Sequence, residues 1–287
     1  MKLTRGKLVE TLRRKNEGWT TYQARKIAWI SIRRVNQVWR AYEQTGKIPE
    51  IGKRVGRPPR PILDEERKLV QRAYAHYRVS ADLLERLIER DSGIHLPHNH
   101  IHRILVELGI ARPLGERIPR KKDWIRYERR HSLTAVHIDW HQRPHDGPWI
   151  LAVVDDASRK LLALVEGRRP TTENSIYGME LALLQGRIRQ CIMDHGAQFL
   201  SNTGGNSVFQ AFLAKHGIKS IICRIKHPQS NGKVEKWFDT YERNRDAFST
   251  VEEFITWYND VRPHRSLNME LLETPEMAFQ RKMRMEA

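Results

Sequence analysis

Three acidic side chains occupy positions where an acid needs an explanation. Asp139 lies within the apolar run VHIDW, Asp194 follows the apolar residues CIM, and Glu235 comes soon after the turn sequence SNG. A carboxylate in a hydrophobic strand loses its hydration, so it requires a buried partner or a bound metal ion. Spacing alone does not bring together three residues so far apart in the chain. The acids are therefore candidates for a shared site that only the fold can assemble.

Nearby polar residues offer alternatives to this site. His137 and His141 alternate with Asp139 along one strand face, which allows a His-Asp-His zinc site, although a strand core or a DNA-facing edge is the favoured interpretation. Asp156 ends another apolar run and is expected to cap a turn or to pair with Arg159. Neither alternative displaces the three acids as the principal candidates.

The sequence from Leu133 onward predicts a sheet covered by helices. The runs TAVHIDWH, PWILAVVDDAS and RKLLALVEG are rich in β-forming residues and separated by turns, as in three consecutive antiparallel strands. Helices are expected over 172–184, 207–216 and 233 to about 245, with strands at RQCIM and IKSIIC between them. This order makes a mixed, five-stranded α/β sheet, in which catalytic groups tend to sit at strand ends.

The charge of the chain is concentrated in its N-terminal part. Of a formal net charge of +17, residues 1–130 contain 31 Lys and Arg against 15 Asp and Glu, whereas residues 131–287 contain 20 against 19. A basic half joined to a nearly neutral half indicates a module that grips a polyanion, fused to a part with another task. Nucleic acid is the favoured partner because phosphate neutralisation releases counterions. A merely soluble basic surface is the alternative.

Residues 3–45 show three short helical patterns of the kind found in a helix-turn-helix unit. The third begins after Ser31, a good N-cap. The residues expected on its inward face are Ile32, Val35, Trp39 and Tyr42. The opposite face is basic and suits contacts with phosphates and base edges, unless it is an ordinary solvated face. Its candidate DNA-binding residues are Arg33, Arg34, Gln37 and Arg40, with Asn36 beside them.

A second set of three helices is expected over 64–77, 80–91 and 98–108, which gives two tandem helix-turn-helix units. Between the two sets lies GKRVGRPPRP, whose Gly and Pro exclude helix and central strand. This extended basic ribbon either enters a minor groove or is a charged linker. The residues that would enter the groove are Arg54, Arg57 and Arg60. The histidines of the third helix and its N-terminal flank lack companion ligands for zinc, which needs about four.

These patterns divide the chain into six expected parts. They are a first helix-turn-helix domain (1–50), a basic Gly/Pro linker (51–62), a second helix-turn-helix domain (63–112), a basic connector (113–130), an α/β catalytic core (131–250) and a C-terminal helical segment (251–287). The length of 287 residues suffices for more than one core of ordinary size.

Cysteine usage and hydropathy indicate the compartment. Cys191 and Cys223 cannot form a disulfide framework, and the N-terminus lacks the apolar region of a signal peptide. No apolar run approaches the length of a membrane span. We therefore expect a protein of a reducing compartment, cytoplasmic and associated with the nucleoid, without membrane contact.

An ordered set of sequence motifs carries a family resemblance. HIDW, DDASR, MDHGAQF and HPQSNGKVEKW occur in that order, followed by FSTVEEFITWYNDVRPHRSLN and TPEMAF. The set resembles the DDE transposases of insertion sequences and their relatives, the retroviral integrases. The N-terminal part resembles the paired helix-turn-helix regions of the same transposases, including a GRP-type linker, so the likeness covers nearly the whole chain.

The resemblance implies a ribonuclease H-like catalytic domain with Asp139, Asp194 and Glu235 as catalytic metal ligands. Two magnesium or manganese ions per active site would be the cofactors, because hard oxygen ligands select such ions. Lys233 and Lys236 would hold the DNA backbone beside Glu235. Two features depart from the family pattern: the residue after the second aspartate is histidine, and 40 residues separate Asp194 from Glu235, which is more than usual.

The implied function is that of a transposase or integrase. Its N-terminal units would recognise the terminal repeats of an element, and its core would cleave and transfer the 3′ ends. Double-stranded DNA would be the partner, with a dimer or larger assembly forming on it. One alternative is a non-enzymatic DNA-binding regulator derived from a transposase. Another is a ribonuclease H-like nuclease without strand transfer. The role of His227, in orienting a phosphate or flanking the turn, stays open.

Overall fold

The computed structural model describes residues 3–51, 60–113, 128–201, 205–223 and 231–283. The chain forms two compact units, Met1–Pro61 and Ile62–Ala287. Most of the expected linker, with Arg54 and Arg57, lies outside the described residues, as do most of the basic connector and His227. None of the described helices is long and apolar enough to cross a membrane.

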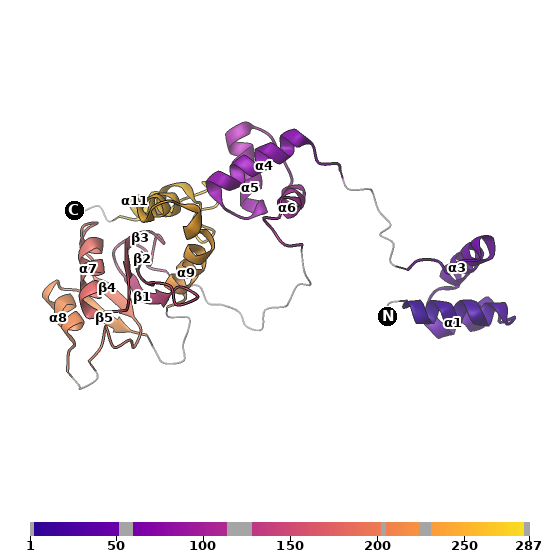
Figure 1. Ribbon diagram of the computed structural model, residues 1–287, viewed down its shortest axis with the longest axis horizontal. Coiled ribbons are helices and arrows are strands. Elements are labelled where there is room, and N and C mark those ends of the chain that lie inside the picture. The colour runs from indigo at the N-terminus through magenta and orange to yellow at the C-terminus, as the bar shows by residue number, and fades with distance from the viewer. Residues whose placement is uncertain (1–2, 52–59, 114–127, 202–204, 224–230, 284–287) are drawn as a thin grey trace. The chain divides into compact units, whose positions relative to one another are not determined.

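The first unit contains three helices (Figure 1): α1 (Arg5–Asn16), α2 (Thr21–Ala28) and α3 (Ile32–Thr45). The predicted N-cap of the third helix is confirmed, because the Ser31 side chain accepts a hydrogen bond from the backbone N–H of Arg34. The predicted inward face is only partly right. Val35 is buried as expected, but Ile32 is 42% exposed, because the buried stripe of α3 runs through Val35 and Val38 and leaves the first turn outside it.

The second unit begins with α4 (Asp64–Tyr77), α5 (Ala81–Ser92) and α6 (His98–Glu107), which lie within one residue of the predicted bounds. We call these three helices the bundle. Its core is apolar and includes a residue from far downstream, Leu272. Ser80 is at the N-cap position of α5, but its side chain makes no cap, because its hydroxyl accepts from the Arg265 guanidinium at 2.7 Å instead.

A five-stranded sheet forms the centre of the second unit, which confirms the predicted mixed sheet. Its strands are β1 (Val136–Gln142), β2 (Trp149–Asp155), β3 (Leu161–Gly167), β4 (Gln190–Met193) and β5 (Lys219–Ile222). The strand order is β3-β2-β1-β4-β5. The first three strands pair antiparallel, and β4 and β5 continue the sheet in parallel with β1.

Helices cover both faces of the sheet (Figure 1). The connecting helices are α7 (Thr172–Leu183), α8 (Val208–Lys215) and α9 (Gly232–Asn244). Alternate residues of β1 such as Val136 and Ile138 pack with α7 and α8. Alternate residues of β2 such as Ile150 and Ala152 pack with α9. Each strand therefore presents one side-chain set to each helical layer, as the period of two requires.

The C-terminal segment packs against the sheet and the bundle. It comprises α10 (Val251–Thr256), a π-helical turn η3 (Trp257–Val261) and α11 (Pro275–Lys282). Phe254, Trp257 and Tyr258 lie in the apolar layer of α9, and Phe279 lies in the layer of α7 and α8. The Trp257 indole N–H also donates to the carbonyl of His76 in the bundle at 3.0 Å. This segment is therefore part of the core and not an appendage to it.

Candidate active site

Strand register directs two of the three acids to the same end of the sheet. Parallel strands β1 and β4 pair Val136 with Cys191 and His137 with Ile192. The same register, continued by two residues past the last pair, would bring Asp139 level with Asp194, the residue that follows β4. Since in-register neighbours point to the same face, and residues two apart share a face, both carboxylates lie on the side opposite the Val136 layer. That side is the one covered by α9.

The third acid comes from the helix on that face. Glu235 lies in the first turn of α9 and is exposed. Partial burial and the charge of Asp239 raise the pKa of Glu235 above its usual range. Asp139 therefore lies on the face of the sheet covered by α9, the helix that carries Glu235, and Asp194 comes directly after the neighbouring strand β4.

Asp139 is half-buried and held by two hydrogen bonds. Its Oδ1 accepts from the backbone N–H of Trp140 and its Oδ2 from the Nδ2 of Asn231, both at 2.8 Å. Burial, followed by the charges of Asp194 and Glu235, raises the pKa of Asp139 to about 7. The carboxylates of Asp194 and Glu235 therefore act electrostatically on Asp139.

Asp194 and its neighbour on β5 complete the strand-end part of the site. Asp194 is half-buried, and its Oδ1 accepts from the backbone N–H of Gly196 at 2.8 Å. Cys223 follows β5 as Asp194 follows β4, and its backbone N–H donates to Met193 at 2.9 Å. Burial and the charges of all three acids raise the pKa of the Cys223 thiol to about 11. Sequence reasoning missed this residue, although its place after an apolar strand was a usable signal.

The donor set fits a hard divalent cation. Among the residues that the structure describes, no three His, Cys, Asp or Glu side chains are close enough together to hold a metal ion. The three acids nevertheless offer only carboxylate oxygens at the heart of the site, the ligands that magnesium and manganese prefer. A cation between them would relieve the repulsion that contributes to the raised pKa of Asp139.

A buried polar network lies behind the acids. Asp156 is fully buried, and its Oδ1 contacts His137 Nε2 at 2.8 Å and Lys233 Nζ at 2.5 Å. Its Oδ2 accepts from the backbone N–H of Arg129 at 2.6 Å. The prediction that Asp156 pairs with Arg159 is wrong, because Asp156 is directed towards β1 and α9 while Arg159 pairs with Glu128 at 3.3 Å.

The candidate DNA-binding residues differ in what they present to solvent. The side chain of Lys233 is only 12% exposed and its ammonium is on Asp156, whereas Lys236 is 66% exposed and pairs with Asp239. In the first unit Arg33, Arg40 and Arg60 are exposed. The Arg34 guanidinium donates to the side-chain oxygen of Gln37 at 2.6 Å.

The histidines have partners other than a metal. His141 stacks on Phe238 and contacts Glu242 at 3.2 Å, and His137 contacts Asp156. These contacts give no support to a His-Asp-His zinc site. In the bundle, His95 and His98 each contact a Glu85 carboxylate oxygen at 2.9 Å.

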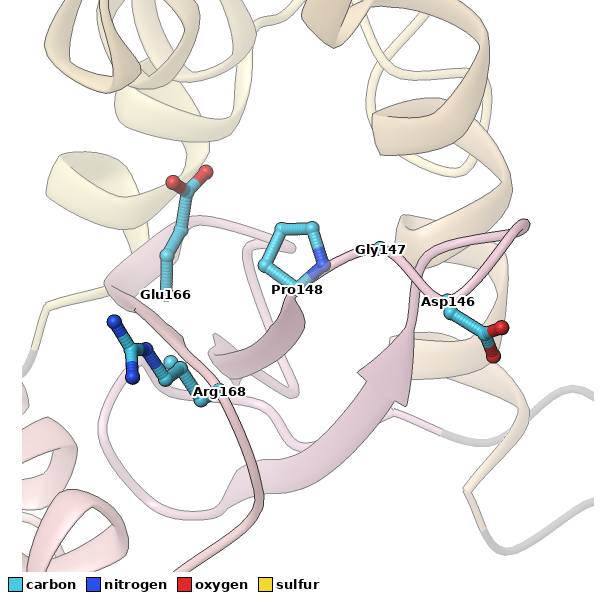
Figure 2. Close-up of a pocket in the computed structure, with 6 residues that line it drawn as sticks. Asp146, Gly147, Pro148, Glu166 and Arg168 are labelled. Atoms are coloured by element: carbon cyan, nitrogen blue, oxygen red, sulfur yellow. The ribbon is translucent and has the colours of Figure 1, made fainter.

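A surface hollow of about 540 Å³ lies between the β1–β2 turn and the end of β3 (Figure 2). It is lined by Asp146, Gly147, Pro148, Glu166, Gly167 and Arg168. Glu166 also accepts a hydrogen bond from the Tyr241 hydroxyl at 2.8 Å. None of the three candidate catalytic acids lines this hollow, so it is separate from the carboxylate site.

Comparison with known proteins points to an integrase-like domain. Residues 216–271 match the family model of the integrase core domain. A protein of Spiroplasma virus SpV1-C74 named "Putative integrase ORF3" is 25% identical over 145 residues, which is 42% of this chain and 40% of that protein. These two matches support an integrase- or transposase-like core in this chain.

The segment that the family model matches covers only part of the described sheet. That segment contains Glu235 and α9, whereas Asp139 and Asp194 lie upstream of it on the sheet. The match covers less than half of the relative's own length. Among solved structures, the catalytic core domain of BIV integrase is similar over 52% of this chain and 94% of its own, with a TM-score of 0.41 and 15% identity.

Proposed function

We propose that the chain is a transposase or integrase of the DDE type that cleaves DNA at the ends of an element and joins the 3′ ends to a target. The observation that supports this proposal is the β1–β4 register, which, continued by two residues past its last pair, would bring Asp139 level with Asp194 on the face covered by α9, the helix of Glu235. Three carboxylates on one face of an integrase-like core are suited to divalent ions and little else, since without cations they repel one another.

The residues of the chain have distinct tasks in this mechanism. Bound divalent ions would supply Lewis acidity for the attacking and leaving oxygens of a phosphodiester. Asp139, Asp194 and Glu235 would hold the ions. The hydrogen bonds from Trp140 and Asn231 orient the Asp139 carboxylate and leave further lone pairs on both oxygens for coordination.

The basic helices would supply the DNA grip. We assign both the first unit and the bundle as helix-turn-helix modules that recognise terminal repeats, with Arg33 and Arg40 on the exposed face of α3. Lys236 would contact the DNA backbone beside Glu235, while Lys233 acts from within the ion pair with Asp156. Two element ends must meet for joining, so we expect a dimer or larger assembly on DNA.

A cleavage assay tests the proposal. The full chain is incubated with magnesium and a duplex carrying the DNA that flanks its gene, and nicked and joined products are resolved on gels. Asp139→Ala, Asp194→Ala and Glu235→Ala should each abolish nicking, whereas Glu252→Ala, which removes an exposed acid in α10, should not. Nicking that survives all three acid substitutions would sink the assignment.

The same gels separate the alternatives. DNA binding without metal-dependent nicking would identify a regulator derived from a transposase. Nicks without joined molecules would identify a nuclease that lacks strand transfer.

A further inference from the structure

The buried carboxylate of Asp156 contacts both β1, which carries Asp139, and α9, which carries Glu235. Asp156 pairs with His137, which lies two residues before Asp139 on β1. It also pairs with Lys233, which lies two residues before Glu235 in the first turn of α9. The same side chain therefore ties the strand of the first acid to the helix of the third.

The shared contacts leave little freedom at this junction. His137 Nε2 and Lys233 Nζ both reach the Oδ1 of Asp156, at 2.8 and 2.5 Å. The side chains of His137 and Asp156 are fully buried, and that of Lys233 nearly so. Charged hydrogen bonds shielded from water are stronger than exposed ones, and they hold their partners in defined positions.

Asn231 extends this network to the first acid. Its side chain is buried at the N-cap position of α9. Its amide nitrogen donates to the Oδ2 of Asp139 at 2.8 Å, while its amide oxygen lies 3.4 Å from the Nδ1 of His137. The start of α9 therefore contacts Asp139 directly, and it also contacts His137 on the same strand.

The adjacent aspartate has the same burial and a different set of partners. Asp155 accepts from the backbone N–H of Leu133 at 2.8 Å and from the backbone and hydroxyl of Ser158 at 2.8 and 2.6 Å. These contacts fix the β2–β3 turn and the approach to β1. They reach neither Asp139 nor α9, so Asp155 provides a matched comparison for Asp156.

We infer that Asp156 is a positioning residue for the divalent-ion site. Through His137, Lys233 and Asn231 it sets the distance between Asp139 and Glu235, and this distance determines how readily the ion binds. It touches neither ion nor DNA itself. The inference rests on the proposed function, since it assigns a role in preparing that same site. Partners behind metal ligands commonly change metal affinity by about 10- to 100-fold when they are replaced.

Manganese titration of the full chain by calorimetry tests this inference. Asp156→Asn and Asn231→Ala should each weaken manganese binding by about 10- to 100-fold. Asp155→Asn is the control for the first substitution. Asn259→Ala is the control for the second, because Asn259 is an equally buried asparagine whose amide bonds the backbone of Leu161 instead. Both controls should lower thermal stability and keep the wild-type manganese affinity.

A second measurement distinguishes positioning from general damage. Raising manganese should restore nicking by Asp156→Asn and by Asn231→Ala, but not by Glu235→Ala, which lacks a ligand. Wild-type affinity in a folded Asp156→Asn variant would overturn the inference and leave the proposed function standing. If Asp156→Asn does not fold, equal affinities of Asn231→Ala and Asn259→Ala overturn it. Wild-type protein that binds no manganese overturns both.

Discussion

The first helical unit and the five-stranded sheet place their charges in opposite ways. The first unit has a small apolar core around Leu8, Leu12 and Val38, and its arginines pair with glutamates at the surface, as Arg14 does with Glu10 and Glu17. The sheet instead surrounds fully buried acids and a buried histidine with apolar layers on both faces. Surface charge attracts a polyanion at little cost to folding, whereas buried charge requires a fixed partner. Single substitutions of charged residues should therefore reduce function gradually in the first helical unit and sharply in the sheet.

The largest effect is expected from losing a carboxylate at the sheet. Asp194→Ala should lower the rate of DNA nicking by about 10³-fold or more, because ion-held transition-state charge is worth several kcal/mol. Arg40→Ala on α3 should nick at nearly the wild-type rate once DNA is saturating. Single-turnover gel assays at saturating DNA measure both rates. Equal losses in the two variants would erase the distinction between the regions.

Core substitutions test whether the two regions also fold separately. Leu151→Ala in β2 should cost about 3 kcal/mol, because the side chain is fully buried and packs where the α7 backbone approaches at Gly178. Leu8→Ala should lower only the transition of the first unit. Calorimetric melting of the full chain would resolve the two transitions. A single transition that both substitutions shift equally would contradict independent folding.

DNA affinity should respond more weakly and should depend on salt. Arg40→Ala should weaken duplex binding by about 3- to 10-fold and reduce the slope of log affinity against log salt by about one. Arg13→Ala is the control, since Arg13 is exposed on α1 but pairs with Glu17 at 2.9 Å. Fluorescence anisotropy over a range of potassium chloride gives both quantities. If the slopes of log affinity against log salt are identical for the two variants, Arg40 on α3 does not contact DNA.

The smallest expected effect concerns pH. Burial opposes ionisation of Asp156, but the hydrogen bond from His137 and the charge of Lys233 outweigh it and hold the pKa of Asp156 well below its usual range. A depressed acid pKa contributes stability above the unfolded pKa, about 4, and that stability is lost as the pH falls below it. The difference in unfolding free energy between wild type and Asp156→Asn should shrink by about 1 kcal/mol or more from pH 6 to pH 3. Urea titrations at each pH measure this free-energy difference. A difference between wild type and Asp156→Asn that grows on acidification would contradict the ion pair of Asp156 with Lys233.

Local sequence patterns predicted the helices and strands. The features that these patterns missed depend on contacts between residues far apart in the chain. Apolar periodicity and caps gave the helices and the mixed sheet, because both signals reside in neighbouring residues. The inward face of α3 was misjudged at Ile32, whose exposure depends on how helices pack and not on spacing. The three acids were chosen from their positions in the sequence, and their grouping stays a prediction, because any approach depends on the pairing of β1 with β4, which no local pattern contains.

The partners of Asp156 show the same limit more sharply. A turn residue beside Arg159 is expected to pair with it, since the two are close in sequence. The actual partners come from β1 and α9, which the fold brings to Asp156 from opposite directions along the chain. The side chain of Lys233 is directed inward for the same reason, because its partner Asp156 is distant in sequence. The sequence alone indicated only that this residue is positively charged.

The placement of Leu272 in the bundle has a consequence for synthesis on the ribosome. The helices from Asp64 to Glu107 are translated well before Leu272, whose side chain is part of their core. Domains generally fold as they emerge, N-terminal parts first. The nascent bundle therefore lacks one apolar side chain of its core until Leu272 has been synthesised. A truncated product that ends before Leu272 exposes this incomplete core to chaperones and proteases.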